Sequence, residues 1–276
     1  MDRIRLIASD MDATLLDEQS QLPADFEETI HALAELGIRF APASGRPLYT
    51  LEAMFPTLQD ELVFIGDNGG AIRWKGQNLF TSEMSPEGWR ALNCLTREQG
   101  DIAVLCGLES AYVERPFAVH DAVLRHFYTK IEYVDRLEDV AAPADKFTIY
   151  LPQHNAQQAY DTVYASQRSI YSVAVAGECW VDIMNPGVHK GAALQTLGQL
   201  WGLPPECIMA FGDTYNDAEM LQTVRYGFLM ENGSVPLRQK VPFLAPSHRE
   251  AGVMQVLHRV LAQNGCVCPE DFVPAH

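Results

Sequence analysis

The stretch Leu6-Ile7-Ala8-Ser9-Asp10-Met11-Asp12-Ala13-Thr14-Leu15-Leu16 decides how the chain is organised. It begins as a short apolar run, typical of a buried strand, and then presents two carboxylates, Asp10 and Asp12, two residues apart. Open α/β sheets hold their ligands at the carboxyl ends of strands, so this position favours a functional site over a core. An Asp-x-Asp pair alone is also typical of turns and helix caps, and both interpretations stand at this point.

The sequence on either side of this stretch follows the order strand, helix, strand. A helix is predicted over residues 23–36, and strands over residues 38–43 and 62–65. Each strand leads into a polar, glycine-containing loop, and in a parallel sheet such loops share one edge. After residue 187 the same order resumes, with a helix over 189–201 (Leu194, Leu197 and Leu200 on one face), strands over 207–211, 227–230 and 242–245, and a helix over 250–262.

The middle of the chain is organised differently, because hairpins alternate with helices. The pattern predicts a strand over residues 146–151, a helix over 153–167, and a hairpin of strands at 171–176 and 180–184. We therefore expect an α/β core from residues 1–82 and 188–276, and an inserted α+β domain with an antiparallel sheet at residues 83–187. The last residues, 266–276, show no periodicity and are predicted to be a loose tail.

Composition excludes several classes of protein. The chain has 276 residues, 47% apolar and 20% charged, which is ordinary for a globular protein with a sizeable core. Its net charge of -16 works against nucleic acid or an anionic membrane surface as a partner. If the ligand is an anion, the site needs local positive charge from lysine, arginine or a bound cation.

The compartment is inferred from the termini and the cysteines. The N-terminal residues carry no signal-peptide pattern, and no apolar run approaches the roughly 18 residues of a membrane span. The six cysteines are scattered through apolar surroundings, which indicates reduced thiols in a cytoplasmic protein. Cys266 and Cys268 have no second pair of ligands nearby, so we interpret them as thiols and not as a metal site.

Four polar clusters lie at strand ends or helix starts: Asp10/Asp12/Thr14, Ser44/Gly45, Lys190 and Asp213/Asn216/Asp217. Each one alone has a structural explanation, such as a helix cap, an acid stabilised by the helix dipole, or a solvated lysine. Together they match a pattern.

In these clusters the chain resembles the haloacid dehalogenase-like superfamily of phosphohydrolases. Its four motifs correspond, in order, to residues 10–16 (Asp-Met-Asp-Ala-Thr-Leu-Leu), Ser44-Gly45-Arg46, Lys190-Gly191 and residues 212–220. The large insert, together with Asn68-Gly69-Gly70, is similar to the Cof-type branch with a C2 (IIB-like) α/β cap. The resemblance extends to about residue 262 and implies a Rossmann-like core, with a parallel sheet and helices on both faces.

The resemblance implies a role for each matching residue. Asp10 would be the nucleophile that forms an aspartyl-phosphate, and Asp12 the acid and base. With Lys190 these residues make up the catalytic set. Asp10, Asp213 and the backbone carbonyl of Asp12 would hold Mg²⁺, because hard oxygen ligands suit this ion. Phosphate would be bound by Thr14, Ser44, Gly45, Lys190 and Asn216. Asp217 would orient the metal ligands, and Arg46 and Asn68 would help at the substrate or cap side.

One residue departs from the family pattern. Ala13 stands where these proteins usually have glycine, and its methyl group can crowd the loop or the phosphate. The substitution removes no reacting group, so it bears on rate more than on the class of reaction.

We expect a cytoplasmic, Mg²⁺-dependent phosphatase of small phosphorylated metabolites, either a sugar phosphate or a phosphorylated cofactor. The inserted domain would cover the site and choose the leaving group, although Trp180 is expected to be simply packed. Two alternatives stay open, a phosphomutase of the same superfamily and a non-catalytic phospholigand-binding protein. The oligomeric state is not predicted.

Overall fold

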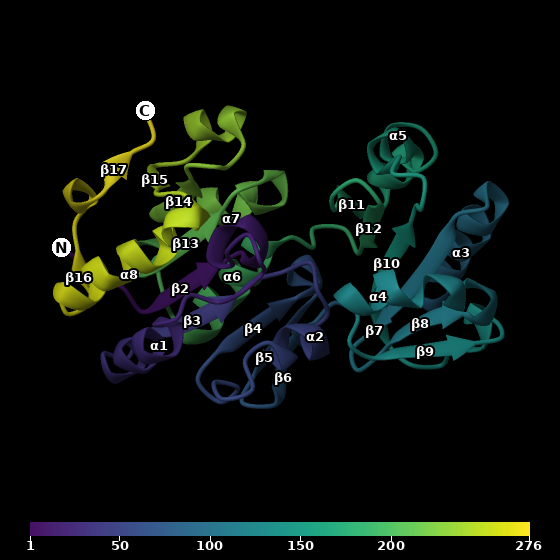
Figure 1. The fold of residues 1–276 in the computed structure, drawn as a ribbon, viewed down its shortest axis with the longest axis horizontal. Helices are drawn as coiled ribbons and strands as arrows, with labels where there is room; N and C mark the ends of the chain where they lie inside the picture. Colours follow the sequence, from purple (N-terminus) through teal and green to yellow (C-terminus); the bar gives the residue numbers. More distant parts are fainter.

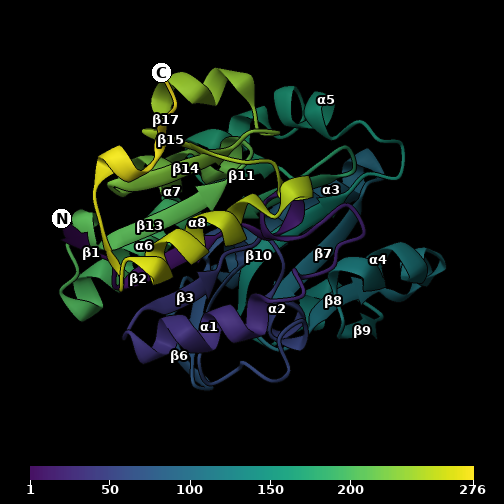
Figure 2. The ribbon, with the colours of Figure 1, turned by 60° about the vertical axis from the view of Figure 1, so that its left-hand side comes forward.

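The chain forms two lobes in the computed structural model, which describes residues 1–276 (Figure 1). The first lobe holds both termini, and the second contains the elements from α3 to β12. Figure 2 shows the ribbon turned so that the first lobe comes forward. None of the helices is both long enough and apolar enough to cross a membrane.

The first lobe is built on a six-stranded sheet in the order β17-β15-β14-β13-β2-β3. The five strands from β15 to β3 are parallel, and β17 is antiparallel to β15. Their bounds are β2 (Leu6–Ser9), β3 (Arg39–Pro42), β13 (Ile208–Gly212), β14 (Tyr226–Met230), β15 (Phe243–Ala245) and β17 (Val273–Pro274).

Helices cover both faces of this sheet, as the alternation along β2 requires. Ile7 packs on one side in the cluster that contains α1 and α8, whereas Leu6 and Ala8 pack on the other side with α6 and α7. The helices of this lobe are α1 (Phe26–Glu35), α2 (Leu48–Ala53), α6 (Lys190–Trp201), α7 (Ala218–Thr223) and α8 (Gly252–Ala262). The predicted core with helices on both faces is confirmed.

A smaller sheet in the order β4-β5-β6 adjoins this core, with bounds β4 (Val63–Gly66), β5 (Ala71–Trp74) and β6 (Gln77–Thr81). The expectation that residues 62–65 belong to the parallel sheet is correct only in part. β4 pairs antiparallel with β5 and meets the end of β3 through a single parallel bridge, Ala43 to Ile65. That bridge still brings the loop after β4 next to the loop after β3, at the carboxyl-terminal edge of the parallel sheet.

The second lobe is an α+β unit around a sheet in the order β11-β12-β10-β7-β8-β9. The bounds are α3 (Pro86–Gln99), β7 (Ile102–Gly107), β8 (Ala111–Glu114), α4 (Asp121–Phe127), β9 (Ile131–Val134), β10 (Ala144–Tyr150), α5 (Ala156–Asp161), β11 (Ser172–Val175) and β12 (Trp180–Met184). The pairings are antiparallel except for β8 with β9, so the predicted inserted α+β cap is confirmed. The limits of the cap at residues 83 and 187 remain our proposal.

Two predictions of local structure are wrong. The predicted helix at residues 153–167 is shorter, because α5 stops at Asp161 and a 3₁₀ turn follows at Ala165–Ser169. In the helix at 189–201, which begins at Lys190, Leu200 is 55% exposed and does not share the buried face of Leu194 and Leu197.

The C-terminal residues are not a loose tail. β16 (Cys266–Val267) pairs with β1 (Asp2–Arg3), and β17 pairs with β15. Phe272, between these two strands, packs edge-on against Phe228 of β14. Strands of two residues have no detectable period, so the sequence pattern missed an ordered edge that is held by one aromatic anchor and by pairing with distant strands.

Candidate active site

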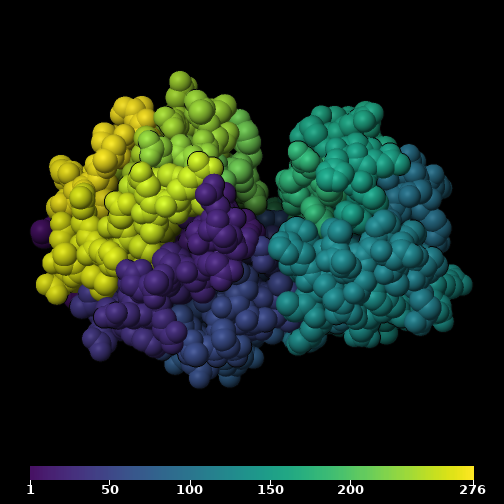
Figure 3. Space-filling model, in the orientation of Figure 1, coloured from purple at the N-terminus to yellow at the C-terminus, as the bar shows by residue number.

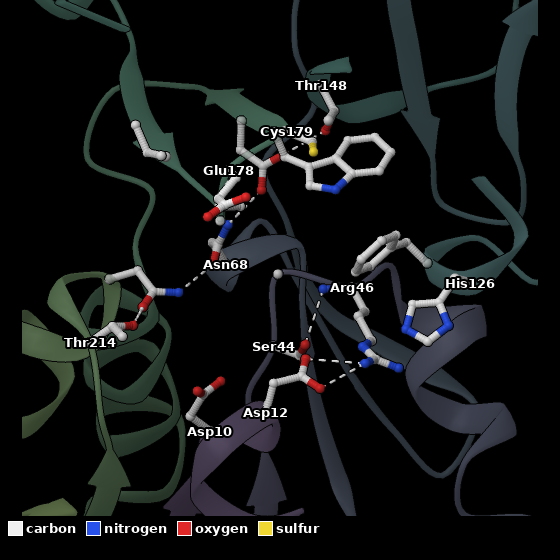
Figure 4. A pocket seen from close by; sticks show the side chains of 18 of the residues that line it. Asp10, Asp12, Ser44, Arg46, Asn68, His126, Thr148, Glu178, Cys179 and Thr214 are labelled. Carbon is white, nitrogen blue, oxygen red and sulfur yellow. Dashed lines mark hydrogen bonds and ion pairs between the residues drawn. The ribbon is translucent and has the colours of Figure 1, made fainter. Parts of the chain in front are cut away.

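The carboxyl ends of β2 and β13 bring the predicted aspartates together. These strands are adjacent and parallel, with Ser9 beside Phe211, and the Asp10 backbone N–H donates to the Phe211 carbonyl (2.9 Å). Asp10 follows the last residue of its strand, and Asp213 does the same in β13, so both residues line the cavity at the edge that faces the cap. Figure 4 shows Asp10 in this position.

Lys190 lies beneath these carboxylates at the start of α6. Its ammonium is fully buried and donates to Asp10 Oδ1 (2.5 Å) and Asp217 Oδ1 (2.7 Å). Burial acts to lower the pKa of Lys190, but the two carboxylates outweigh it and raise that pKa, so the group stays charged. This lysine therefore supplies fixed positive charge in a protein of net charge -16.

Asp217 organises the loop after β13. Its Oδ2 accepts the backbone N–H groups of Asp213 (3.0 Å) and Thr214 (3.2 Å), while Oδ1 accepts from Lys190. All of its strong contacts are inside the protein and it is fully buried. The geometry therefore suits a supporting role better than direct contact with substrate.

Three carboxylates form a group that can hold a cation. One oxygen each from Asp10, Asp213 and Asp217 lies within 4.8 Å of the others. Burial, followed by repulsion from Asp217, raises the pKa of Asp10 well above its usual range and that of Asp213 to about 6. Lys190 balances only one of these three negative charges, and a hard cation with oxygen ligands would provide the remaining positive charge.

The Asp12 side chain does not join this group. It turns toward Arg46, whose Nη2 donates to both of its oxygens at 2.8 and 3.1 Å, and away from Asp10 (Figure 4). Arg46 also lies over the ring of Phe127 in the cap, 6.0 Å from the ring centroid. The ion pair thus connects the loop after β2 to the loop after β3 and to the cap.

Ala13 occupies a left-handed turn. Residues Met11–Leu15 form one distorted helical turn in which Ala13 has φ 57°, a conformation that favours glycine. The Asn232 side chain donates to the Ala13 carbonyl (2.9 Å) and helps to hold the turn. The methyl group is therefore accommodated at the cost of local backbone strain.

The predicted phosphate-binding residues are placed around the same edge with different exposure. Ser44, Gly45 and Asn216 line the cavity, and Ser44 Oγ accepts the Arg46 backbone N–H (3.1 Å). Thr14 is buried, and its hydroxyl has no hydrogen-bond partner in the protein. Thr14 and Lys190 lie beneath the cavity and do not line it.

The cavity between the lobes has a volume of about 680 Å³. Figure 3 shows the lobes separated on one side and in contact on the other. The cap contributes an aromatic wall, formed by Phe127, Tyr128 and Trp180. It also contributes lining residues that the sequence analysis did not single out. These lining residues are His126, Phe127, Tyr128, Lys146, Thr148, His154, Val175, Ala176, Gly177 and Cys179.

Trp180 both packs and lines the cavity. It is only 8% exposed and lies against Tyr150 (4.5 Å between ring centroids) and Phe127 (5.1 Å). The expectation of a packed tryptophan holds, but its position beside the cavity could not be foreseen. One sequence feature could have identified Lys146, namely a lysine that opens an otherwise apolar strand pattern.

Comparison with known proteins shows the family. Residues 7–257 match the model of the haloacid dehalogenase-like hydrolases, and the chain belongs to this family. A crystal structure of a Streptococcus mutans protein superposes with a TM-score of 0.85 at 28% identity, covering 94% of this chain and 99% of that one.

Two relatives cover nearly the whole chain. One is the Escherichia coli 5-amino-6-(5-phospho-D-ribitylamino)uracil phosphatase YbjI, 31% identical over 94% of this chain and 96% of its own length. The other is the HMP-PP phosphatase of Cronobacter sakazakii, 31% identical over 87% of this chain and 89% of its own length. The predicted superfamily and the enzyme class, a phosphatase, are confirmed.

Proposed function

We propose that the chain is a Mg²⁺-dependent phosphatase that hydrolyses a small phosphorylated metabolite through an aspartyl-phosphate on Asp10. One observation carries this proposal. The buried Lys190 ammonium bonds to Asp10 at the edge where Asp213 and the loop after β3 also meet, beneath a cavity covered by the cap. A carboxylate in this position can attack phosphorus as a nucleophile, and the neighbouring ammonium places positive charge beside the phosphoryl group that is transferred.

The residues would divide the reaction between them. Asp10 would attack phosphorus, while Lys190 and the hydroxyl and backbone donors at Thr14, Ser44 and Gly45 would stabilise the phosphoryl oxygens. The unpartnered Thr14 hydroxyl and the Gly45 backbone N–H, which has no acceptor within the protein, are free to take such bonds.

Asp12 would protonate the leaving oxygen and then activate water. Because its carboxylate is paired with Arg46 and turned away from Asp10, the side chain would have to exchange Arg46 for the substrate. The exposed position of Asp12, 56% for the side chain, leaves room for that rotation.

The cation would be held by Asp10, Asp213 and the carbonyl of Asp12, with Asp217 orienting them. When bound, Mg²⁺ supplies the positive charge that neutralises the phosphate and the crowded carboxylates. The carboxylate cluster, with its raised pKa values at Asp10 and Asp213, supports a hard cation at this place.

Of the two predicted substrate classes, the cap favours a phosphorylated cofactor intermediate with a flat heterocycle. The aromatic wall around Trp180 offers a stacking surface, which a sugar ring uses less well than a heterocycle does. The two relatives named above carry a uracil and an HMP-PP substrate in their names, in agreement with this choice.

The test is phosphate release from a panel of phosphorylated metabolites with Mg²⁺, with EDTA, and with Asp10→Asn. We expect release that depends on Mg²⁺ and is lost in Asp10→Asn, with the highest kcat/KM on phosphorylated heterocycles. Inert wild-type protein, or full activity of Asp10→Asn, would contradict the proposal.

The same assay separates the alternatives. A phosphomutase would pass the phosphoryl group to a second hydroxyl in the presence of a bisphosphate activator, which product analysis detects. A non-catalytic binding protein would bind phosphate without turnover. The complete set of Asp10, Asp12, Lys190 and Asp213 favours hydrolysis over loss of activity.

A further inference from the structure

A second lysine, Lys146, is buried between the lobes. It belongs to β10 of the cap and is only 2% exposed. Its ammonium donates to the Gly45 carbonyl of the core (2.5 Å) and forms ion pairs with Asp67 (3.0 Å) and Asp182 (3.6 Å). A buried ammonium is unfavourable unless it is fully paired, so each of these contacts matters.

The pleat of β10 explains why a cap lysine reaches the core. Phe147 and Ile149 point to the cap's own apolar core with α3 and α5. Lys146 and Thr148 alternate with them and therefore face the cavity and the other lobe. The neighbouring strand β12 places Asp182 directly opposite Thr148, on the same face.

Lys146 completes the anchoring of the loop after β3. The Ser44 carbonyl accepts the Asn68 backbone N–H and the Arg46 carbonyl accepts the Asp67 backbone N–H, each at 2.9 Å. The carbonyl between them, that of Gly45, is bound by Lys146. Three successive peptide carbonyls of the proposed phosphate-binding loop are therefore held, the outer two by the core and the middle one by the cap.

The partners around Lys146 already balance its charge. Burial and the neighbouring Asp67 raise the pKa of a third carboxyl, Asp145, well above its usual range. The ammonium faces two carboxylates as ion pairs and donates one hydrogen bond to a backbone carbonyl. A direct contact with the leaving group would require one of these partners to be given up.

The same network reaches the other side of the proposed site. Asp182 accepts from Thr148 (2.7 Å) and from the Asn68 side chain (3.0 Å). Asn68 in turn accepts a long bond from Asn216 (3.5 Å), in the loop after β13. One polar network thus joins two strands of the cap to both loops that are proposed to hold phosphate.

We propose that Lys146 is a positioning residue, which fixes the Gly45–Arg46 peptide from the cap and so makes the geometry of the phosphate site depend on how the cap is docked. This inference rests on the proposed function, because it assigns a task in phosphate binding. It differs from a leaving-group contact, which would affect only large substrates, and from a purely structural ion pair, which would affect only stability.

The test compares Lys146→Met, which keeps the length of the side chain and loses its donors, with Lys130→Met, an exposed cap lysine outside the cavity. The double variant Lys146→Met/Asp67→Asn removes the unpaired buried carboxylate and protects the fold, with Asp67→Asn alone as its reference. Inorganic phosphate binding with Mg²⁺ is measured by calorimetry, and kcat and KM are measured with p-nitrophenyl phosphate and with the best metabolite.

We expect Kd for inorganic phosphate to rise about tenfold and kcat to fall about 10–100-fold in Lys146→Met and in the double variant. Both substrates should lose kcat/KM by the same factor, because the defect lies at the phosphate. Lys146→Gln, which keeps a donor for the Gly45 carbonyl, should recover part of the loss, and Lys130→Met should behave as wild type.

Wild-type phosphate binding and kcat in the folded double variant would overturn the proposal, since Lys146 would then be purely structural. A loss confined to the large metabolite would overturn it as well, because it would indicate a leaving-group contact. If the wild type neither binds inorganic phosphate nor hydrolyses p-nitrophenyl phosphate, the proposed function itself fails, and the role of Lys146 fails with it.

Discussion

Each lobe contains one buried lysine whose charge is balanced by two carboxylates, but the two lysines have different further contacts. Lys190 at the start of α6 lies between Asp10 and Asp217, and Lys146 in β10 lies between Asp67 and Asp182. Both pairings overcome the cost of burial and raise the pKa of the ammonium.

The difference between them lies in what else the ammonium touches. Lys190 bonds to Asp10, the proposed nucleophile, so in the proposed reaction its charge would act at the reacting atoms. Lys146 bonds to a backbone carbonyl, so its effect passes through the shape of a loop. A buried charge can therefore act on the reacting group directly or hold the loop around it. The bond to Asp10 or to the Gly45 carbonyl distinguishes the two cases.

The largest effect is expected from Lys190→Met. Removing it leaves Asp10 and Asp217 facing each other without a counter-charge, and we expect kcat to fall about 10²–10³-fold and stability to fall by about 3–5 kcal/mol. Steady-state kinetics and urea unfolding measure both. A loss no larger than that of Lys146→Met would break the proposed distinction between direct and indirect action.

A substitution in the cap wall should affect binding of the leaving group instead of the phosphate. In Trp180→Leu the stacking surface is lost, and we expect KM for a phosphorylated heterocycle to rise about tenfold. The kcat/KM for glycerol phosphate, whose leaving group has no ring to stack, should stay within about twofold of wild type.

The matched control is Trp74→Leu, which changes a tryptophan of the first lobe that packs against Trp201 and lies outside the cavity. An equal rise in KM in both variants, or a wild-type KM in Trp180→Leu, would refute the assignment of the aromatic wall to the leaving group.

Metal binding should depend on pH through Asp213. Without a cation its folded pKa of about 6 lies above the ordinary value of 3.8, so the folded state holds a proton that the unfolded state releases. In EDTA, this group's contribution to stability is therefore present below the ordinary pKa and is lost as the pH rises through 6.

Mg²⁺ binds the ionised carboxylates, so the rise in Tm on adding Mg²⁺ should shrink as the pH falls below 6. Thermal unfolding with and without Mg²⁺ across this range measures the effect, with Asp213→Asn as the variant that should respond weakly. A Tm increase that is independent of pH, or unchanged in Asp213→Asn, would be incompatible with the proposed cation site.

The smallest effect is expected at Ala13. Glycine suits its left-handed backbone better, so Ala13→Gly should stabilise the protein by about 1 kcal/mol and change kcat less than twofold. Ser20→Gly is the matched control, because Ser20 has the same φ of 57° in an exposed position outside the site. A large change in kcat in Ala13→Gly alone would show that the methyl group reaches the phosphate.

The sequence by itself determined the core and its four polar clusters. Apolar runs such as residues 6–9, each followed by a polar loop, are local signals, and parallel strands must bring such loops to one edge. For this reason the sequence groups Asp10, Lys190, Asp213 and Asp217, and the structure places them together.

Only the tertiary structure decided the rest. The turn of Asp12 toward Arg46, the pairing of the C-terminal strands and the insertion of Lys146 between the lobes all depend on partners from 34 to more than 200 residues away. Such contacts leave no periodic trace in the sequence, because they are set by how the cap docks on the core. The local hydrophobic pattern determines which side chains lie at the end of a strand. The packing of elements that are distant in the sequence determines which of these side chains contact one another.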